Sequence, residues 1–219
     1  MNSIVRHILI ADDHSIIRVG LRFILNSQFN VYKIDEVSDK KGLFEALSNK
    51  QYSHLILDLQ LQHYHALVDV PALRKQYPDL MILIYSMSQE EVLGKRLLKM
   101  GVNGFLSKLS AGSELKKALN LFLSGRNYVS DNLREALQNK TVRFEPKQNP
   151  FDELSVQEMT VVIYLILGKR SKDIASVLQL KSTTIATYKA RIYNKLKVKN
   201  LMELQNLGKI YELDVPVLS

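Results

Sequence analysis

Cysteine is absent from the 219-residue chain, which excludes disulfide bonds, zinc–thiolate sites and thiol nucleophiles. No apolar run is as long as a membrane span, and the amino terminus lacks the pattern of a signal peptide. Internal repeats and low-complexity tracts are also missing. We therefore expect a soluble, cytoplasmic protein with no membrane partner, long enough for one large or two small domains.

Negative charge is scarce in residues 169–199, where nine lysines and arginines face a single carboxylate, Asp173. This segment alone accounts for the formal net charge of +8 that the whole chain carries. A run of cations is commonly no more than the solvated face of a helix. The gathering of the entire excess in one short segment instead indicates a nucleic-acid partner.

Short apolar runs alternate with amphipathic stretches over the first 125 residues. The runs predict strands at residues 7–11, 31–37, 54–59, 80–85 and 103–107. Helical spacing predicts helices at residues 16–26, 42–49, 70–77, 91–100 and 113–123. This alternation predicts an α/β fold with a five-stranded, doubly wound parallel sheet that carries helices on both faces.

Polar side chains follow four of the predicted strands: Asp12 and Asp13, then Asp58, Ser86 and Lys108. Taken singly, each is an ordinary loop residue. Because ligands bind at the carboxyl edge of such a sheet, we expect the five to converge there. Clustered carboxylates favour Mg²⁺, and one of them could attack a phosphoryl group while the lysine and the hydroxyl hold its oxygens.

On these residues, the segment 6–125 resembles the receiver domain of bacterial two-component response regulators, which has a flavodoxin-like fold. The resemblance implies that a histidine kinase phosphorylates Asp58. It also implies that Asp12, Asp13, Asp58 and the backbone carbonyl of Gln60 bind Mg²⁺.

The same resemblance assigns Ser86 and Lys108 to the phosphate. It makes Ser86 and Phe105 the switch residues, Phe105 being the aromatic side chain that turns inward on activation. Dimerisation on phosphorylation is predicted through residues 90–100, the fifth strand and residues 113–123.

The loop after Asp58 departs from the receiver pattern, because Gln62 and Ala66 stand where proline and glycine are usual. The change loosens one turn restraint and removes an easy route to positive φ. His63 and His65 suggest a second metal site, but we expect them to be exposed and solvated.

Residues 126–150 are predicted to form a linker with a short helix at 132–138 followed by a flexible stretch. Residues 151–219 predict four compact helices. Ser155 with Glu158 forms a capping box, Ser182 is expected to cap the third helix, and Asn200 with Glu203 the fourth. A basic third helix in such a group predicts a helix-turn-helix module.

This last segment resembles the LuxR-type DNA-binding domain of the NarL/FixJ group. The matching positions are Leu154, Glu158, Gly168, Ile174, Ala175, Leu178, Thr184, Ile185, Lys195, Leu196 and Val198. Ala186 and Tyr188 replace the usual lysine and histidine. The stretch TIATYKAR is similar to the Bordetella virulence-regulator branch of the group.

The third helix of this segment divides into two faces at helical spacing. Ile185, Tyr188, Ile192 and Leu196 should face the core, and the opposite face should enter the major groove of promoter DNA. The residues expected to contact DNA are Lys172, Thr183, Thr184, Ala186, Thr187, Lys189, Ala190, Arg191 and Lys195. The cations should bind phosphates, whereas the alanines either contact thymine methyl groups or only allow close approach.

These patterns favour a phosphorylation-controlled transcription factor over an enzyme. A phosphatase of the haloacid-dehalogenase type would need a second aspartate at the position of Gln60. A phosphorylation-independent regulator, whose receiver serves as a dimerisation module, is the alternative that Gln62 and Ala66 suggest.

Overall fold

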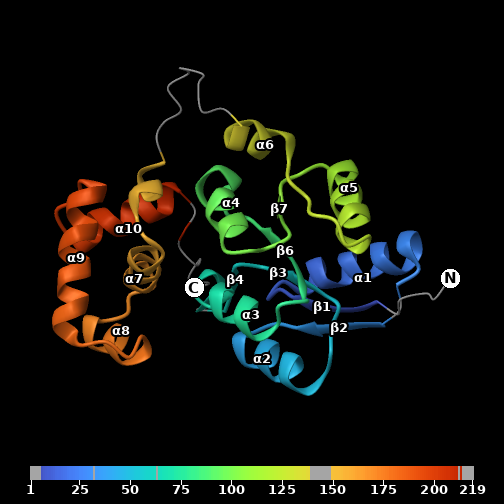
Figure 1. The fold of residues 1–219 in the computed structure, drawn as a ribbon, viewed down its shortest axis with the longest axis horizontal. Coiled ribbons are helices and arrows are strands. Elements are labelled where there is room, and N and C mark those ends of the chain that lie inside the picture. The colour runs from blue at the N-terminus through green and yellow to red at the C-terminus, as the bar shows by residue number, and fades with distance from the viewer. Residues whose placement is uncertain (1–5, 32, 63, 139–148, 212, 214–219) are drawn as a thin grey trace. The chain divides into compact units, whose positions relative to one another are not determined.

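The computed structural model describes residues 6–31, 33–62, 64–138, 149–211 and 213. The chain divides into two compact units, residues 1–139 and 140–219 (Figure 1). In the described residues no helix is both long and apolar enough to cross a membrane.

The first unit is built on a parallel sheet with the strand order β2-β1-β3-β6-β7. Its strands are β1 (His7–Ala11), β2 (Lys33–Val37), β3 (His54–Leu57), β6 (Met81–Ser86) and β7 (Gly104–Ser107). The register pairs Ile8 with both Ile34 and His54, and the central strands β1 and β3 are almost wholly buried. Burial on both faces explains their uninterrupted apolar sequences. The five predicted strands and their parallel order are confirmed.

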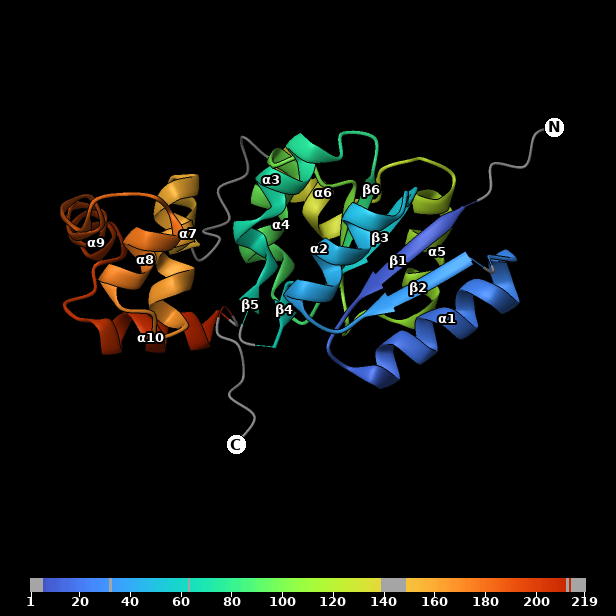
Figure 2. The ribbon, with the colours of Figure 1, turned by 90° about the horizontal axis from the view of Figure 1, so that it is seen from below.

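Helices cover both faces of this sheet (Figures 1 and 2). They are α1 (Ser15–Phe29), α2 (Lys40–Asn49), α3 (Val70–Gln76), α4 (Glu90–Lys99) and α5 (Gly112–Leu123). A sixth helix, α6 (Asp131–Gln138), packs on α4. On one face, Ile8 and Ile10 pack with Leu25 of α1 and Phe122 of α5. Leu9 alternates with them along β1, so it faces the side that α2, α3 and α4 cover.

The segment after Asp58 is more ordered than its sequence predicts. It forms a small antiparallel pair, β4 (Gln60–Leu61) and β5 (Tyr64–His65), followed by a 3₁₀ turn, η1 (Ala66–Val68). Its residues Leu61, Tyr64 and Ala66 are buried, and this apolar packing explains why the segment folds back on the unit.

The prediction that His65 is solvated is wrong, because the side chain is only 1% exposed. Its Nδ1 atom accepts a hydrogen bond from the Leu67 backbone N–H at 3.4 Å. Burial lowers the pKa of His65 to about 4, so the ring is neutral at pH 7. His63 lies outside the described residues.

The helix predicted at residues 132–138 is present as α6, and it packs on α4. Residues 126–138 thus belong to the first unit, although the sequence assigns them to a linker. The polar sequence of this segment does not predict its packing on α4, because that surface forms only when the receiver has folded. Residues 139–148 of the predicted linker lie outside the described residues.

The second unit contains the predicted four helices after a 3₁₀ turn, η2 (Pro150–Glu153). They are α7 (Val156–Ile166), α8 (Ser171–Val177), α9 (Ser182–Leu196) and α10 (Leu201–Ile210). Gly168, at φ 75°, ends α7 in the left-handed conformation that glycine adopts without strain.

Three capping predictions can be compared with the helix ends. The Ser155–Glu158 capping box is present, and Glu203 N–H donates to Asn200 Oδ1 at 2.9 Å. The cap assigned to Ser182 is wrong: the carbonyl of Lys181 accepts the first helical bond, so α9 begins one residue earlier. Ser182 is therefore the first residue inside the helix.

A polar cluster beside the start of β1 stabilises the first unit through Asp35. Asp35 Oδ2 accepts hydrogen bonds from Lys50 at 2.8 Å and from Tyr52 at 2.6 Å, and His7 Nε2 lies 3.0 Å away. The bond from Lys50, followed by that from Tyr52, lowers the pKa of Asp35 to about 2.

We predict that Asp35→Asn lowers the free energy of unfolding at pH 7 by about 1–3 kcal/mol, as expected for hydrogen bonds to a charged group. Because the pKa of Asp35 is depressed on folding, its contribution is complete above about pH 4 and is lost towards pH 2. The difference between the variant and the wild type should shrink over that range. Urea unfolding at several pH values measures it, with Glu45→Gln, an exposed carboxylate, as control. A difference that stays constant from pH 7 to pH 2 would contradict the assignment.

Candidate functional sites

The carboxyl edge of the sheet brings the predicted acidic, hydroxyl and ammonium groups together. Lys108 Nζ lies 2.6 Å from Asp58 Oδ2 and 2.6 Å from Asp12 Oδ2. Ser86 Oγ donates a hydrogen bond to Asp58 Oδ1 at 2.6 Å. Backbone bonds from Asp58 N to Ala11 O and from Lys108 N to Ser86 O hold the strand ends that carry these groups.

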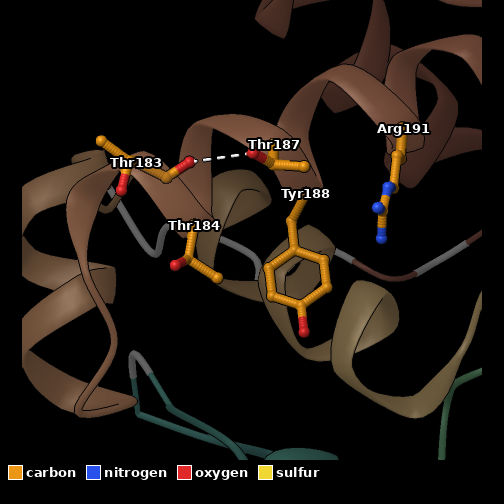
Figure 3. A pocket seen from close by; sticks show the side chains of 5 residues that line it. All are labelled: Thr183, Thr184, Thr187, Tyr188 and Arg191. Carbon is orange, nitrogen blue, oxygen red and sulfur yellow. Dashed lines mark hydrogen bonds between the residues drawn. The ribbon is translucent and has the colours of Figure 1, made fainter.

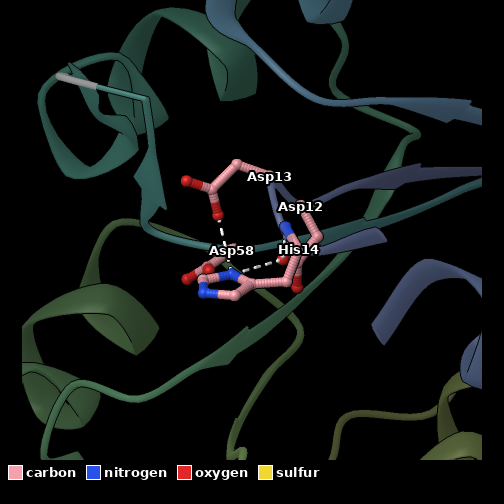
Figure 4. Close-up of side chains that lie close together, drawn as sticks. All are labelled: Asp12, Asp13, His14 and Asp58. Carbon is pink, nitrogen blue, oxygen red and sulfur yellow. Dashed lines mark hydrogen bonds and ion pairs between the residues drawn. The ribbon is translucent and has the colours of Figure 1, made fainter. Parts of the chain in front are cut away.

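A group of possible metal ligands surrounds Asp58 at this edge (Figure 4). Ligand atoms of Asp12, Asp13, His14 and Asp58 all lie within 4.8 Å of one another. The backbone N–H of Gln60 donates to Asp58 Oδ1 at 3.2 Å, so Gln60 also lies beside the cluster. His14 is an addition that the sequence did not single out: its Nδ1 atom is 2.8 Å from Asp13 Oδ1.

Burial sets the electrostatics of the site. The side chains of Asp12, Asp58 and Lys108 are at most 4% exposed. Burial raises the pKa of Asp58, and the Lys108 ammonium opposes that rise. Burial alone would lower the pKa of Lys108, but Asp58 and Asp12 raise it overall, so this ammonium stays charged.

The donor set fits a hard divalent cation. Three carboxylates face one ammonium, so the cluster keeps an excess of negative charge that a cation would neutralise. Oxygen ligands of this kind suit Mg²⁺, which commonly binds one or two carboxylates and keeps further positions open.

The two departures from the receiver pattern have structural consequences in β4 and β5. Gln62 has φ 21°, and its backbone N–H donates to Asp13 Oδ2 at 3.3 Å. A proline at this position could not make that bond, since it has no N–H. Ala66 has no positive φ and starts the turn η1, so the backbone here does not require glycine.

Phe105 is fully buried on β7, opposite Ile84 of β6. It lines a cavity of about 280 Å³ together with Glu90, Glu114 and Tyr128. The aromatic ring is thus inward, with open space beside it.

In the second unit, α9 has a buried and an exposed face. Ile185, Ile192 and Leu196 are buried as predicted, whereas Tyr188, which was also predicted to face the core, is only half-buried and lines an open hollow on the helix. The exposed residues of the opposite face are Thr183, Ala186, Thr187, Ala190 and Asn194. An open hollow of about 260 Å³ on this helix is lined by Thr183, Thr184, Thr187, Tyr188 and Arg191 (Figure 3).

The cations of the second unit differ in what they contact. Lys172 and Arg191 are exposed, and Lys189 Nζ lies 5.5 Å from the centre of the Tyr193 ring. Lys195 Nζ is instead 2.7 Å from Glu158 Oε2, a buried carboxylate on α7. Its ammonium is therefore used within the unit, which the sequence alone did not indicate.

Comparison with known proteins agrees with this division of the chain. Residues 8–120 match the family model of the response regulator receiver domain, and residues 152–207 match that of the bacterial regulatory proteins of the luxR family. The chain is 28% identical to the Fimbriae Z protein of Salmonella typhimurium over 207 residues, 94% of this chain and 97% of that protein. It is 29% identical to the oxygen regulatory protein NreC of Staphylococcus epidermidis over 204 residues, 90% of this chain and 94% of that protein.

Solved structures show the same fold. RcsB from Salmonella enterica serovar Typhimurium, bound to the promoter rprA in the presence of the phosphomimetic BeF₃⁻, superposes with a TM-score of 0.71 at 24% identity. The match covers 92% of this chain and 97% of that one.

A flavodoxin-like sheet with an acidic carboxyl edge, followed by a helix-turn-helix unit, defines a two-domain signalling protein. The chain belongs to the two-component response regulators, with a receiver domain and a DNA-binding domain of the luxR family.

We predict that Lys108→Met destabilises the first unit by about 3–5 kcal/mol when no divalent cation is present, because it leaves two buried carboxylates without their partner. Added Mg²⁺ should restore part of this loss by compensating the same charge. Thermal unfolding with and without Mg²⁺ measures both effects. Lys41→Met, which removes an exposed ammonium, serves as control. Equal losses in the two variants would exclude this role for Lys108.

Proposed function

We propose that this response regulator is phosphorylated on Asp58 by a histidine kinase, in a reaction that requires Mg²⁺. The observation that carries the proposal is the placement of the Asp58 carboxylate between the Ser86 hydroxyl and the Lys108 ammonium, beside Asp12 and Asp13. Asp12, Asp13, Asp58 and the backbone carbonyl of Gln60 would hold the cation, which would neutralise charge on the phosphoryl oxygens.

The chain's own groups supply the remaining chemistry. An oxygen of Asp58 attacks phosphorus, a new O–P bond forms, and the P–N bond to the kinase histidine breaks. Lys108 and Ser86, which now bind the two oxygens of the free carboxylate, are within reach of the oxygens of the new phosphate. The Lys108 ammonium and the Ser86 hydroxyl would move from the carboxylate to the phosphate, and this movement would be the signal that the receiver passes on.

We further propose that this signal shifts the population between two packings of the receiver and promotes a dimer. Ser86 and Phe105 are suited to the role, because Ser86 ends β6, Phe105 lies on the neighbouring β7, and open space adjoins the Phe105 ring. The dimer would then bind promoter DNA and regulate transcription.

DNA binding is proposed for the exposed face of α9. Ala186, Ala190 and the threonines present a small, uncharged surface that fits the major groove. The exposed cations Lys172 and Arg191, and the half-buried Lys189 of α9, suit phosphate contacts. Among the relatives by fold, RcsB has been solved on promoter DNA, which supports this use of the unit.

We predict that incubation with Mg²⁺ and a small phosphodonor adds one phosphoryl group to the wild-type chain, as read by intact mass. Asp58→Asn should abolish the addition because it removes the nucleophile. Asp13→Ala should abolish it together with Mg²⁺ binding, because it removes a ligand. Asp79→Asn, an exposed carboxylate outside the cluster, should behave as the wild type. Full phosphorylation of Asp13→Ala would overturn the proposed site.

A second prediction separates Arg191 from Lys195. Arg191→Ala should weaken binding to all DNA sequences and reduce the salt dependence by about one phosphate contact. Lys195→Met should instead lower the melting temperature, since it leaves the buried Glu158 carboxylate without its partner, and should preserve the salt dependence. Fluorescence anisotropy at several salt concentrations measures both. A reduced salt dependence in Lys195→Met, with an unchanged melting temperature, would assign that ammonium to DNA.

A further inference from the structure

Residues 126–138, here called the cover, run along the outer edge of β7 and over α4 (Figure 1). Tyr128 N–H donates to Asn103 O at 2.8 Å, and Tyr128 forms a parallel bridge with Gly104. The side chain of Asn103 also donates to Asn127 Oδ1 at 3.0 Å. The cover therefore continues the hydrogen bonding of the sheet beyond its last strand.

Side-chain contacts attach the cover to α4 and α5. Tyr128 is 1% exposed, and its hydroxyl donates to Glu114 Oε1 of α5 at 2.7 Å. Ser130 Oγ donates to Glu90 Oε2, in the first turn of α4, at 2.6 Å. Ser130 Oγ also accepts a hydrogen bond from the Leu133 backbone N–H at 3.1 Å, so Ser130 caps α6 and links it to α4.

Leu133 of α6 fits over a glycine of α4. Its side chain is 4% exposed, and a Cβ atom built on Gly94 would lie 2.9 Å from Leu133 Cδ2. A side chain at position 94 would therefore require the end of the Leu133 side chain to shift. Gly94 lies inside a helix, where glycine is unfavourable, and the close approach of Leu133 explains its presence.

The cover binds the surface through which the dimer was predicted to form. Glu90 and Gly94 belong to the α4 part of that surface, and Glu114 belongs to the α5 part. Because cover atoms lie on all three, another molecule cannot contact them at the same time. We infer that the cover and a second copy of the receiver are mutually exclusive occupants of this α4–β7–α5 surface; this rests on the proposed dimerisation.

The contact is suited to release. Below the cover is the cavity of about 280 Å³ that Phe105 lines. Glu90 Oε1 is buried there without a hydrogen-bond partner among the described residues. The cover also brings the carboxylate of Asp131 near that of Glu114. Lys117 Nζ lies 3.2 Å from Glu114 and 3.5 Å from Asp131. Separating an interface that contains an unpaired carboxylate oxygen and a cavity costs less free energy than separating a fully packed one.

The connection to the phosphorylation site is short. Ser86 Oγ binds Asp58 and lies 3.5 Å from the backbone nitrogen of Ser88. Glu90, which Ser130 binds, follows two residues later at the start of α4. A movement of Ser86 towards a phosphate would therefore also move the segment between Ser86 and Glu90, and with it the Glu90 carboxylate that Ser130 binds.

The test compares a double variant of the cover, Ser130→Ala with Leu133→Ala, with Glu135→Ala in the full-length chain. The double variant removes the contacts to Glu90 and Gly94 and leaves the α4–β7–α5 surface itself unchanged, whereas Glu135 is exposed on the same helix. Hydrogen exchange at the amide of Tyr128, which donates to Asn103 O, reports whether the cover is bound. Sedimentation without a phosphodonor reports association.

We expect the double variant to accelerate exchange at the Tyr128 amide and to dimerise at concentrations about tenfold lower than the wild type, since the competing segment is released. Glu135→Ala should change neither. Faster exchange with unchanged association would overturn the inference, and so would unchanged exchange, because these contacts would then not hold the cover. If the double variant fails to fold, Ser130→Ala alone weakens the same contact.

Wild-type chain treated with phosphodonor distinguishes this inference from the proposed function. If the wild type is phosphorylated by mass and dimerises, but the double variant does not gain association, only the role of the cover is wrong. If neither the phosphorylated wild type nor the double variant associates, the proposed dimerisation fails and the competition fails with it.

Discussion

The ion pairs of Lys108 are the constraint on which the carboxyl edge of the receiver depends. Asp12 and Asp58 are buried carboxylates, and burying a charge without a partner is costly. Lys108 reaches both at 2.6 Å, and its own charge is retained because they are there. Each group is thus stable only in the presence of the others. The same arrangement leaves an excess of negative charge, which makes the edge receptive to a divalent cation and then to a phosphoryl group.

The sheet and this edge could be predicted because their signals are local. A strand buried on both faces must be apolar throughout, and the order of strands and helices fixes which ends meet. Asp12, Asp58 and Lys108 then follow from position alone. The segment after Asp58 could not be predicted in the same way, because β4 and β5 have two residues each and show no period. His65 is buried by packing against the rest of the unit, and a histidine in so short a segment shows no period that would predict its burial.

The second unit shows the same limit of local signals. Ser182 is a favourable cap by residue type, yet α9 begins one residue earlier than predicted because the Lys181 carbonyl accepts the first bond. Lys195 has the sequence signature of a phosphate-binding cation, and its ammonium also lies 2.7 Å from the Glu158 carboxylate, 37 residues away in the sequence. Residue type alone indicates neither the first helical hydrogen bond nor the contact with Glu158. Exposed positions such as Ala186 and Ala190 were placed correctly, because helical period alone decides which face they occupy.

A glycine inside a helix or strand can indicate a close contact that neither composition nor hydrophobic period predicts. Gly94 and Gly104 have ordinary negative φ values, so neither is needed for a turn. A Cβ atom would meet Leu133 at the first and the Tyr128 carbonyl oxygen at the second, each at 2.9 Å. Both glycines therefore mark places where the chain beyond α5 approaches an element of the receiver closely. A glycine inside a strand or helix, where its flexibility is a cost, indicates a neighbour even when the sequence does not say which one. Here both point to residues 126–138, and they make this segment part of the receiver rather than a passive connection to the DNA-binding unit.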